Sequence, residues 1–115
     1  MALSEQQIKE IKNAGATFMF YNRPPVEVRK ELDLGYRIEN QSVYVFEIRP
    51  RWDKPEEILH EDVAKTTYVK TQGVWKVYWM RGDLKWHRYG PQPEVATISE
   101  FFDLVAGDDY ACFFG

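Results

Sequence analysis

The residues best suited to binding chemistry in this sequence are cations and aromatic rings that alternate between positions 65 and 90. The cations in this stretch meet only one opposing carboxylate, that of Asp83. Cations that follow a phosphate backbone, with rings on which bases stack, are what binding of a single-stranded nucleic acid requires. An ordinary sheet, with buried rings and solvated lysines, would give the same pattern, so both interpretations stay open. The cations are Lys65, Lys70, Lys76, Arg81, Lys85 and Arg88, and the rings are those of Trp75, Tyr78, Trp79, Trp86 and Tyr89.

Two further residues are candidates for acid–base chemistry. Glu47 stands between Phe46 and Ile48, and a partly buried carboxylate at such a position can act as a general acid or base. A structural ion pair with a nearby arginine is the alternative. His87 can exchange protons near neutral pH, or it can be an ordinary amphipathic strand residue. No cofactor motif is present, and the acidic segment around His60 lacks organised ligand spacing, so we expect no cofactor and no metal site.

A hairpin must position most of these groups. Residues 74–81 and 84–89 have the composition of strands, and Gly82 at the first position of a two-residue turn is typical of a type II′ turn. This turn would place Tyr78 opposite His87 and Trp79 opposite Trp86, with the tryptophans on a core face. The candidate binding residues on the second, amphipathic face are Lys76, Tyr78, Lys85, His87 and Tyr89, to which we add Arg81 beside the turn.

The preceding half of the sequence predicts a helix followed by another hairpin. A capping box beginning at Ser4 and an apolar stripe predict a helix that ends before the prolines at 24 and 25. A short helix is expected over residues 26–32, with an extended segment as the alternative. From Tyr36 the period changes to two, which predicts a hairpin around Asn40-Gln41 whose second strand ends at Pro50.

The remaining segments complete an α+β domain over residues 1–115. We expect a charged loop with one helical turn over 53–62 and a strand over 63–71. A second capping box at Thr97 predicts a C-terminal helix, packed on one sheet face, that ends at Gly107. The expected architecture is an N-terminal helix, about five antiparallel strands in hairpins and a C-terminal helix. The apolar tail could cover the other sheet face, which would otherwise remain for a partner.

Composition limits the class of protein. The chain has 115 residues and a hydrophobic fraction of 44%, which suits one domain with a core. A single cysteine, Cys112, excludes an internal disulfide and favours the cytoplasm. The start of the chain does not resemble a signal peptide, and no apolar run is long enough for a membrane span, so we expect no membrane partner. The formal net charge of −3 gives no overall attraction to nucleic acid.

Several stretches together resemble a bacterial family known as domain of unknown function 3024. The resemblance covers nearly the whole chain and implies a small bacterial protein without assigned activity, cofactor or catalytic residues. In shape, the leading helix and the Trp-Lys hairpin look something like the RelE-type endoribonuclease toxins, which are strongly basic where this chain is acidic. The stretches that carry the family resemblance are 32–38, 46–52, 63–69, 74–81, 84–89 and 111–115.

Three functional hypotheses follow from these observations. The first is a non-enzymatic binding module that uses the amphipathic face for a protein or a single-stranded nucleic acid. The second is a small RelE-like ribonuclease, which requires Glu47 and His87 to converge in one cleft. The third is a homodimer that buries the same face.

Overall fold

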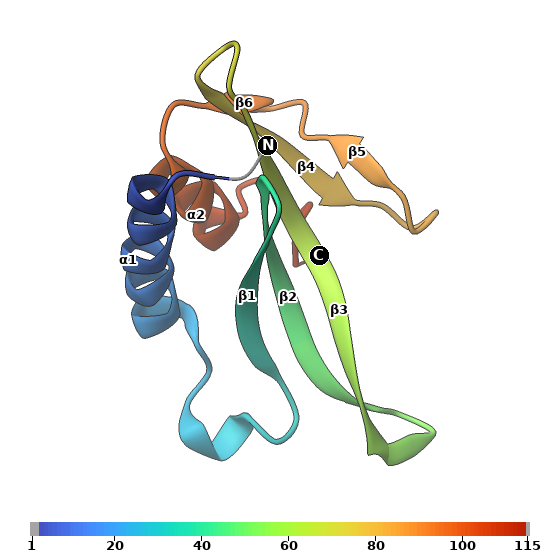
Figure 1. Cartoon of the computed structure of the whole chain (residues 1–115). Coiled ribbons are helices and arrows are strands. Elements are labelled where there is room, and N and C mark those ends of the chain that lie inside the picture. Colours follow the sequence, from blue (N-terminus) through green and yellow to red (C-terminus); the bar gives the residue numbers. More distant parts are fainter. Residues whose placement is uncertain (1–2, 115) are drawn as a thin grey trace.

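The structure is a computed structural model that describes residues 3–114 of the chain, so Gly115 of the predicted tail lies outside it. The chain forms a six-stranded antiparallel sheet, with one α-helix before the strands in the sequence and one after them (Figure 1). The strand order is β1-β2-β3-β4-β5, and β6 also pairs with β4. This arrangement confirms the predicted α+β class and the order of helix, antiparallel strands and helix. The elements are α1 (Glu5–Asn22), η1 (Val26–Val28), β1 (Asp33–Glu39), β2 (Ser42–Arg51), β3 (Lys54–Val69), β4 (Val74–Met80), β5 (Trp86–Arg88), β6 (Glu94–Val95) and α2 (Ile98–Gly107).

Both helices begin at the predicted caps. The Ser4 hydroxyl accepts a hydrogen bond from the Gln7 backbone N–H at 3.1 Å, and the Gln7 side chain accepts one from the Ser4 N–H at 2.9 Å. Thr97 caps α2 by accepting from the Glu100 N–H at 3.2 Å. The helix predicted over residues 26–32 is wrong in extent, because only the single 3₁₀ turn η1 forms. No helix among residues 3–114 is long and apolar enough to cross a membrane.

One hydrophobic core joins both helices to one face of the sheet. Val43, Val45 and Val77 of the sheet are fully buried in the same cluster as Ile11 of α1 and Phe101 of α2. In Figure 1 both helices lie on the same side of the sheet, which we call the helix side. We call the opposite sheet face the open face.

The C-terminal tail also packs on the helix side. The ring of Phe113 lies 4.8 Å from the ring of Tyr89, and both side chains are buried. Asp108 holds the tail in place, because its carboxylate accepts hydrogen bonds from the backbone N–H groups of Phe113 and Phe114, both at 3.0 Å. The described part of the tail therefore completes the core beside Tyr89.

The charged segment at 53–62 is a strand rather than the predicted loop with a helical turn. β2 continues through Pro50, and a two-residue turn at Trp52-Asp53 returns the chain into β3. Pro50 does not end β2, because β1 reaches only as far as Ile48 and proline is tolerated at such an edge. Beyond that point β2 and β3 form a two-stranded arm (Figure 1), whose exposure to water accounts for its charged composition.

The hairpin between β4 and β5 has a longer loop than predicted. Leu84 N–H donates to the Arg81 carbonyl at 2.9 Å, and Arg81 N–H donates to the Lys85 carbonyl at 3.2 Å. This is a three-residue loop, 82–84, with a residue of positive φ (61°) at Leu84, as in a type I turn followed by a bulge. Gly82 has no positive φ, so the predicted type II′ turn is wrong.

The extra loop residue shifts the register by one position. Met80 lies opposite Trp86, Trp79 opposite His87, and Tyr78 opposite Arg88. Since residues directly opposite share a face, the shift reverses both faces of β5 relative to the prediction. The first hairpin has the predicted register, with Tyr36 opposite Val45 and Arg37 opposite Tyr44.

The two loop positions favour opposite residue types, since Leu84 has a positive φ and Gly82 does not. We expect Leu84→Gly to stabilise the protein by about 1 kcal/mol, because a non-glycine residue is strained at positive φ and this side chain is 81% exposed. We expect Gly82→Ala to be neutral or stabilising by about 0.5 kcal/mol, because nothing lies within 4 Å of the added Cβ. Urea unfolding of both variants measures the two effects. A loss of more than about 1 kcal/mol in Gly82→Ala would support the type II′ turn instead.

Candidate functional site

The open face carries a row of alternating cations and rings that crosses five strands. Arg37 of β1 lies opposite Tyr44 of β2, which lies opposite Lys65 of β3. Lys65 in turn lies opposite Tyr78 of β4, and Tyr78 lies opposite Arg88 of β5. We call these five residues the cation–aromatic row. It crosses four strand spacings, about 19 Å, at roughly 4.8 Å each.

Lys65 lies at the centre of this row among three aromatic rings. Its Nζ atom is 5.6 Å from the ring centres of Tyr44 and Tyr78 and 5.8 Å from that of Trp86. The rings of Tyr44 and Trp86 are 6.0 Å apart although two strands separate β2 from β5, so they lean toward each other above the sheet. Each ring face attracts the ammonium by about 0.5–1 kcal/mol at a partly exposed site.

Arg37 anchors the other end of the row. Its guanidinium donates two hydrogen bonds to Asp62, at 2.6 and 3.0 Å, and its Cζ lies 4.3 Å from the centre of the Tyr44 ring. The hydrogen bonds to Asp62 raise the pKa of Arg37 above its usual value, so this group stays charged. Arg37 and Asp62 therefore neutralise one another and hold Tyr44 in position.

Three cations on the open face make no ion pair within residues 3–114: Lys65, Lys76 and Arg88. Arg88 is exposed, while Lys76 and Lys65 are half-buried. The carboxylate of Glu94 lies on the same face, because Glu94 of β6 is opposite Lys76. The ion pair between Arg37 and Glu39 at 3.2 Å places a further carboxylate on this face. The open face therefore has four cations, Arg37, Lys65, Lys76 and Arg88, against three carboxylates, Glu39, Asp62 and Glu94, in a chain whose formal net charge is −3.

The structure keeps two of the six predicted binding residues on the open face, Lys76 and Tyr78. It turns His87 and Tyr89 to the helix side, because the register of β5 is shifted. Lys85 lies in the chain between the loop and β5, and its backbone closes the hairpin. Arg81 lies 5.5 Å from the centre of the Trp79 ring, which belongs to the helix side.

The sequence analysis named Trp86 and Arg88 without placing them on the same face as Lys65, and it did not name Arg37 or Tyr44 among the candidate binding residues. The predicted two-residue turn at Asn40-Gln41 implies that Arg37 lies opposite Tyr44, and the structure has this pair. The sequence analysis did not predict that β2 pairs with β3. This strand pairing brings Arg37 and Tyr44 beside Lys65. The charged segment at 53–62 hid this pairing because its composition is typical of a loop.

His87 forms a local pair rather than a reactive group on the open face. Its Nε2 atom lies 2.8 Å from the Asp83 carboxylate. This hydrogen bond is the main reason why the pKa of Asp83 is lowered, and the Lys85 backbone N–H adds to it at 3.0 Å. Tyr89 is buried, and burial raises the pKa of its hydroxyl.

Glu47 is bound to Arg49 at 2.7 Å, in the ion pair that was the alternative to a catalytic role. Its side chain is 13% exposed. Two strands, β3 and β4, separate Glu47 on β2 from His87 on β5. The structure therefore does not bring this pair together.

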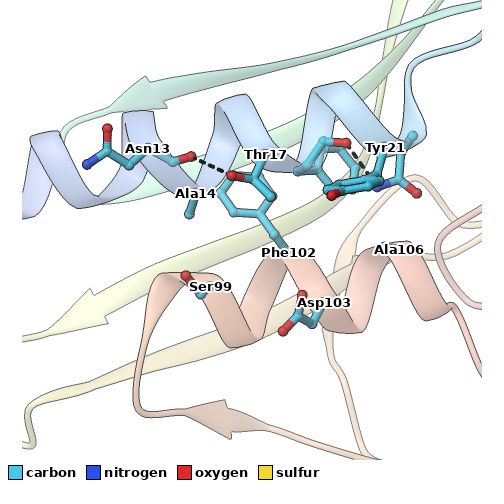
Figure 2. Close-up of a pocket in the computed structure, with 10 residues that line it drawn as sticks. Asn13, Ala14, Thr17, Tyr21, Ser99, Phe102, Asp103 and Ala106 are labelled. Atoms are coloured by element: carbon cyan, nitrogen blue, oxygen red, sulfur yellow. Dashed lines mark hydrogen bonds between the residues drawn. The ribbon is translucent and has the colours of Figure 1, made fainter.

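A second concave region lies between α1 and α2 (Figure 2). This groove has a volume of about 490 Å³, and Phe102 points from α2 toward α1 across it. Asp103 is the one charged side chain among its ten described lining residues. The groove has no cation among these residues, so it offers less to a charged ligand than the open face. Its other lining residues are Asn13, Ala14, Thr17, Phe18, Tyr21, Asn22, Ser99 and Ala106.

Comparison with known proteins shows a family that has no assigned activity. A family model described as "Domain of unknown function (DUF3024)" matches residues 3–115, so the chain belongs to this family. No curated protein and no solved structure matches the chain. The residues of the open face therefore carry the functional argument by themselves.

The Asp83–His87 pair can be tested directly. We expect His87→Ala to raise the pKa of Asp83, because the charged carboxylate loses its main hydrogen-bond partner. Arg81→Gln should raise it less, since Arg81 contributes only through the weakest of the lowering interactions. Carboxyl ¹³C NMR titration measures both changes. An unchanged pKa in His87→Ala would show that the pair does not form in solution.

Proposed function

We propose that this protein is a non-enzymatic binding module whose open face holds single-stranded nucleic acid. The observation that carries the proposal is the cation–aromatic row, in register across β1 to β5. Phosphates would lie against the unpaired cations, and bases would stack on rings of the same face. Stacking on aromatic side chains tolerates any base, so sequence preference would be weak.

Each type of group has a defined part in this proposal. Arg88 and Lys76 supply charge at the β5 end of the row, and neither forms an ion pair in the described part of the chain. Trp86 supplies the largest ring, and Tyr44 and Tyr78 continue the platform toward β1. Lys65 holds the three rings together, because its ammonium lies within 6 Å of each.

The proposal predicts a measurable dependence on salt. Three phosphates neutralised by Lys65, Lys76 and Arg88 give a slope of about −2 for log K against log salt, at roughly −0.7 per phosphate on a single strand. Arg88→Gln should weaken binding and make this slope shallower by about 0.7. Fluorescence anisotropy of a labelled oligonucleotide at about 50 and about 200 mM salt measures both effects.

Two further variants distinguish binding by the open face from non-specific attraction to any exposed cation. Trp86→Leu should reduce affinity roughly 5- to 150-fold with little change in salt slope, because it removes a stacking surface worth about 1–3 kcal/mol. Lys12→Gln is the matched control for Arg88→Gln, since Lys12 is an exposed cation on α1. Equal losses in Lys12→Gln and Arg88→Gln, or no salt-sensitive binding at all, would overturn the proposal.

The competing hypothesis is that the open face binds a second copy of the chain or another protein instead of a nucleic acid. Light scattering distinguishes the copy, because a dimer would have a mass near twice 13.6 kDa. A dimer that dissociates on Trp86→Leu and binds no oligonucleotide would favour self-association over the proposed function.

A further inference from the structure

A small pocket lies on the open face where the sheet divides at the outer edge of β4. β5 pairs with Tyr78–Met80 on that edge, and β6 pairs with Trp75 and Lys76. Between them the backbone of Val77 accepts a hydrogen bond from Tyr89 N–H and donates one to the Pro93 carbonyl, both at 2.9 Å. The residues that line the pocket are Lys76, Val77, Tyr78, Arg88, Pro93 and Glu94.

The size of the pocket limits what it can hold. Its volume is about 110 Å³. Pockets that enclose a drug-sized molecule have about 300–1,000 Å³, so a nucleoside does not fit inside. A single tetrahedral group with several hydrogen-bond acceptors is of the right size.

The lining favours an anion of more than one charge. Lys76 and Arg88 offer two cations, and the Tyr78 hydroxyl can donate a further hydrogen bond. Glu94 opposes them with one carboxylate and lies directly opposite Lys76. A phosphate monoester carries a charge of about −1.5 to −2 at neutral pH, against −1 for a phosphodiester, so it gains more from the two cations.

The position of the pocket also favours the end of a nucleic-acid chain over its middle. Tyr78 and Arg88 belong both to the pocket and to the cation–aromatic row. Pro93 and Glu94 of the β6 side form the wall beyond them. A nucleic acid that follows the row from β1 reaches this wall at its end, where its last phosphate meets Lys76 and Arg88.

We propose that this pocket recognises a terminal phosphate of a single-stranded nucleic acid. This inference rests on the proposed function and specifies which strands the open face prefers. Because Lys76 and Glu94 carry opposite charges, substituting each of them should change the preference for a phosphorylated strand in opposite directions.

The test compares three versions of one oligonucleotide: unphosphorylated, 5′-phosphorylated and 3′-phosphorylated. We expect one phosphorylated form to bind roughly tenfold more tightly at pH 7.5, as for an added hydrogen-bonded charge pair. The preference should decline as the pH falls through about 6, where the monoester loses its second charge. Anisotropy competition against the unphosphorylated form measures each ratio.

Two variants test the pocket itself. Lys76→Gln should abolish the preference for the phosphorylated form, and it should weaken the unphosphorylated strand only by the loss of one of three phosphate contacts. Glu94→Gln should increase the preference by a few fold because an opposing carboxylate is removed. Equal binding of all three oligonucleotides would overturn the pocket but leave the proposed function intact. Failure of every oligonucleotide to bind would overturn the proposed function, and the pocket with it.

Discussion

The backbone register across β1 to β5 is the constraint on which the rest of this structure depends. Directly opposite residues of an antiparallel sheet share a face, so the cation–aromatic row exists only because all four pairings are in step. A slip of one residue at β5 would turn Trp86 and Arg88 to the helix side. The three-residue loop with Leu84 at positive φ prevents that slip. The core on one face and the row on the other therefore depend on the same hydrogen bonds.

The distribution of charge explains how an acidic chain presents a basic face. The excess of negative charge lies in the last part of the sequence, because residues 89–115 contain five carboxylates, Glu94, Glu100, Asp103, Asp108 and Asp109, and no lysine or arginine. The arm formed by β2 and β3 is charged but balanced, since Arg51 and Lys54 form ion pairs with Asp53 and Glu57. β4 pairs with β3 only from Ala64 onward, so the arm has a free edge among the described strands. Charged side chains protect such an edge from pairing with another chain. Charged residues of both signs thus protect the arm, while Lys65, Lys76 and Arg88 remain on the open face.

Much of the fold follows from local sequence signals, because those signals act within a few residues. The capping box at Ser4, the stop at the prolines after Arg23 and the Asn40-Gln41 turn all form as predicted. The register of β5 could not be read in the same way, because Gly82-Asp83 fits a two-residue turn and a longer loop equally well. The hydrogen bonds of Arg81 with Leu84 and Lys85 decide between them, and Tyr89, which packs on Phe113 in the core, donates to the Val77 carbonyl in the same register. The candidate site changed accordingly from the His87 side of β5 to the Trp86 side.

The most direct measurement uses the four tryptophans as reporters at different places in the fold. Trp86 lies on the open face, Trp75 is buried on the helix side, and Trp52 is 92% exposed at the tip of the arm. In ¹H–¹⁵N NMR spectra, each indole N–H gives its own signal when an oligonucleotide is added. The account predicts that the Trp86 signal shifts strongly and saturably, while that of Trp52 does not move. A shift of the Trp52 signal with Trp86 unaffected would contradict the account, since it would place the ligand on the arm.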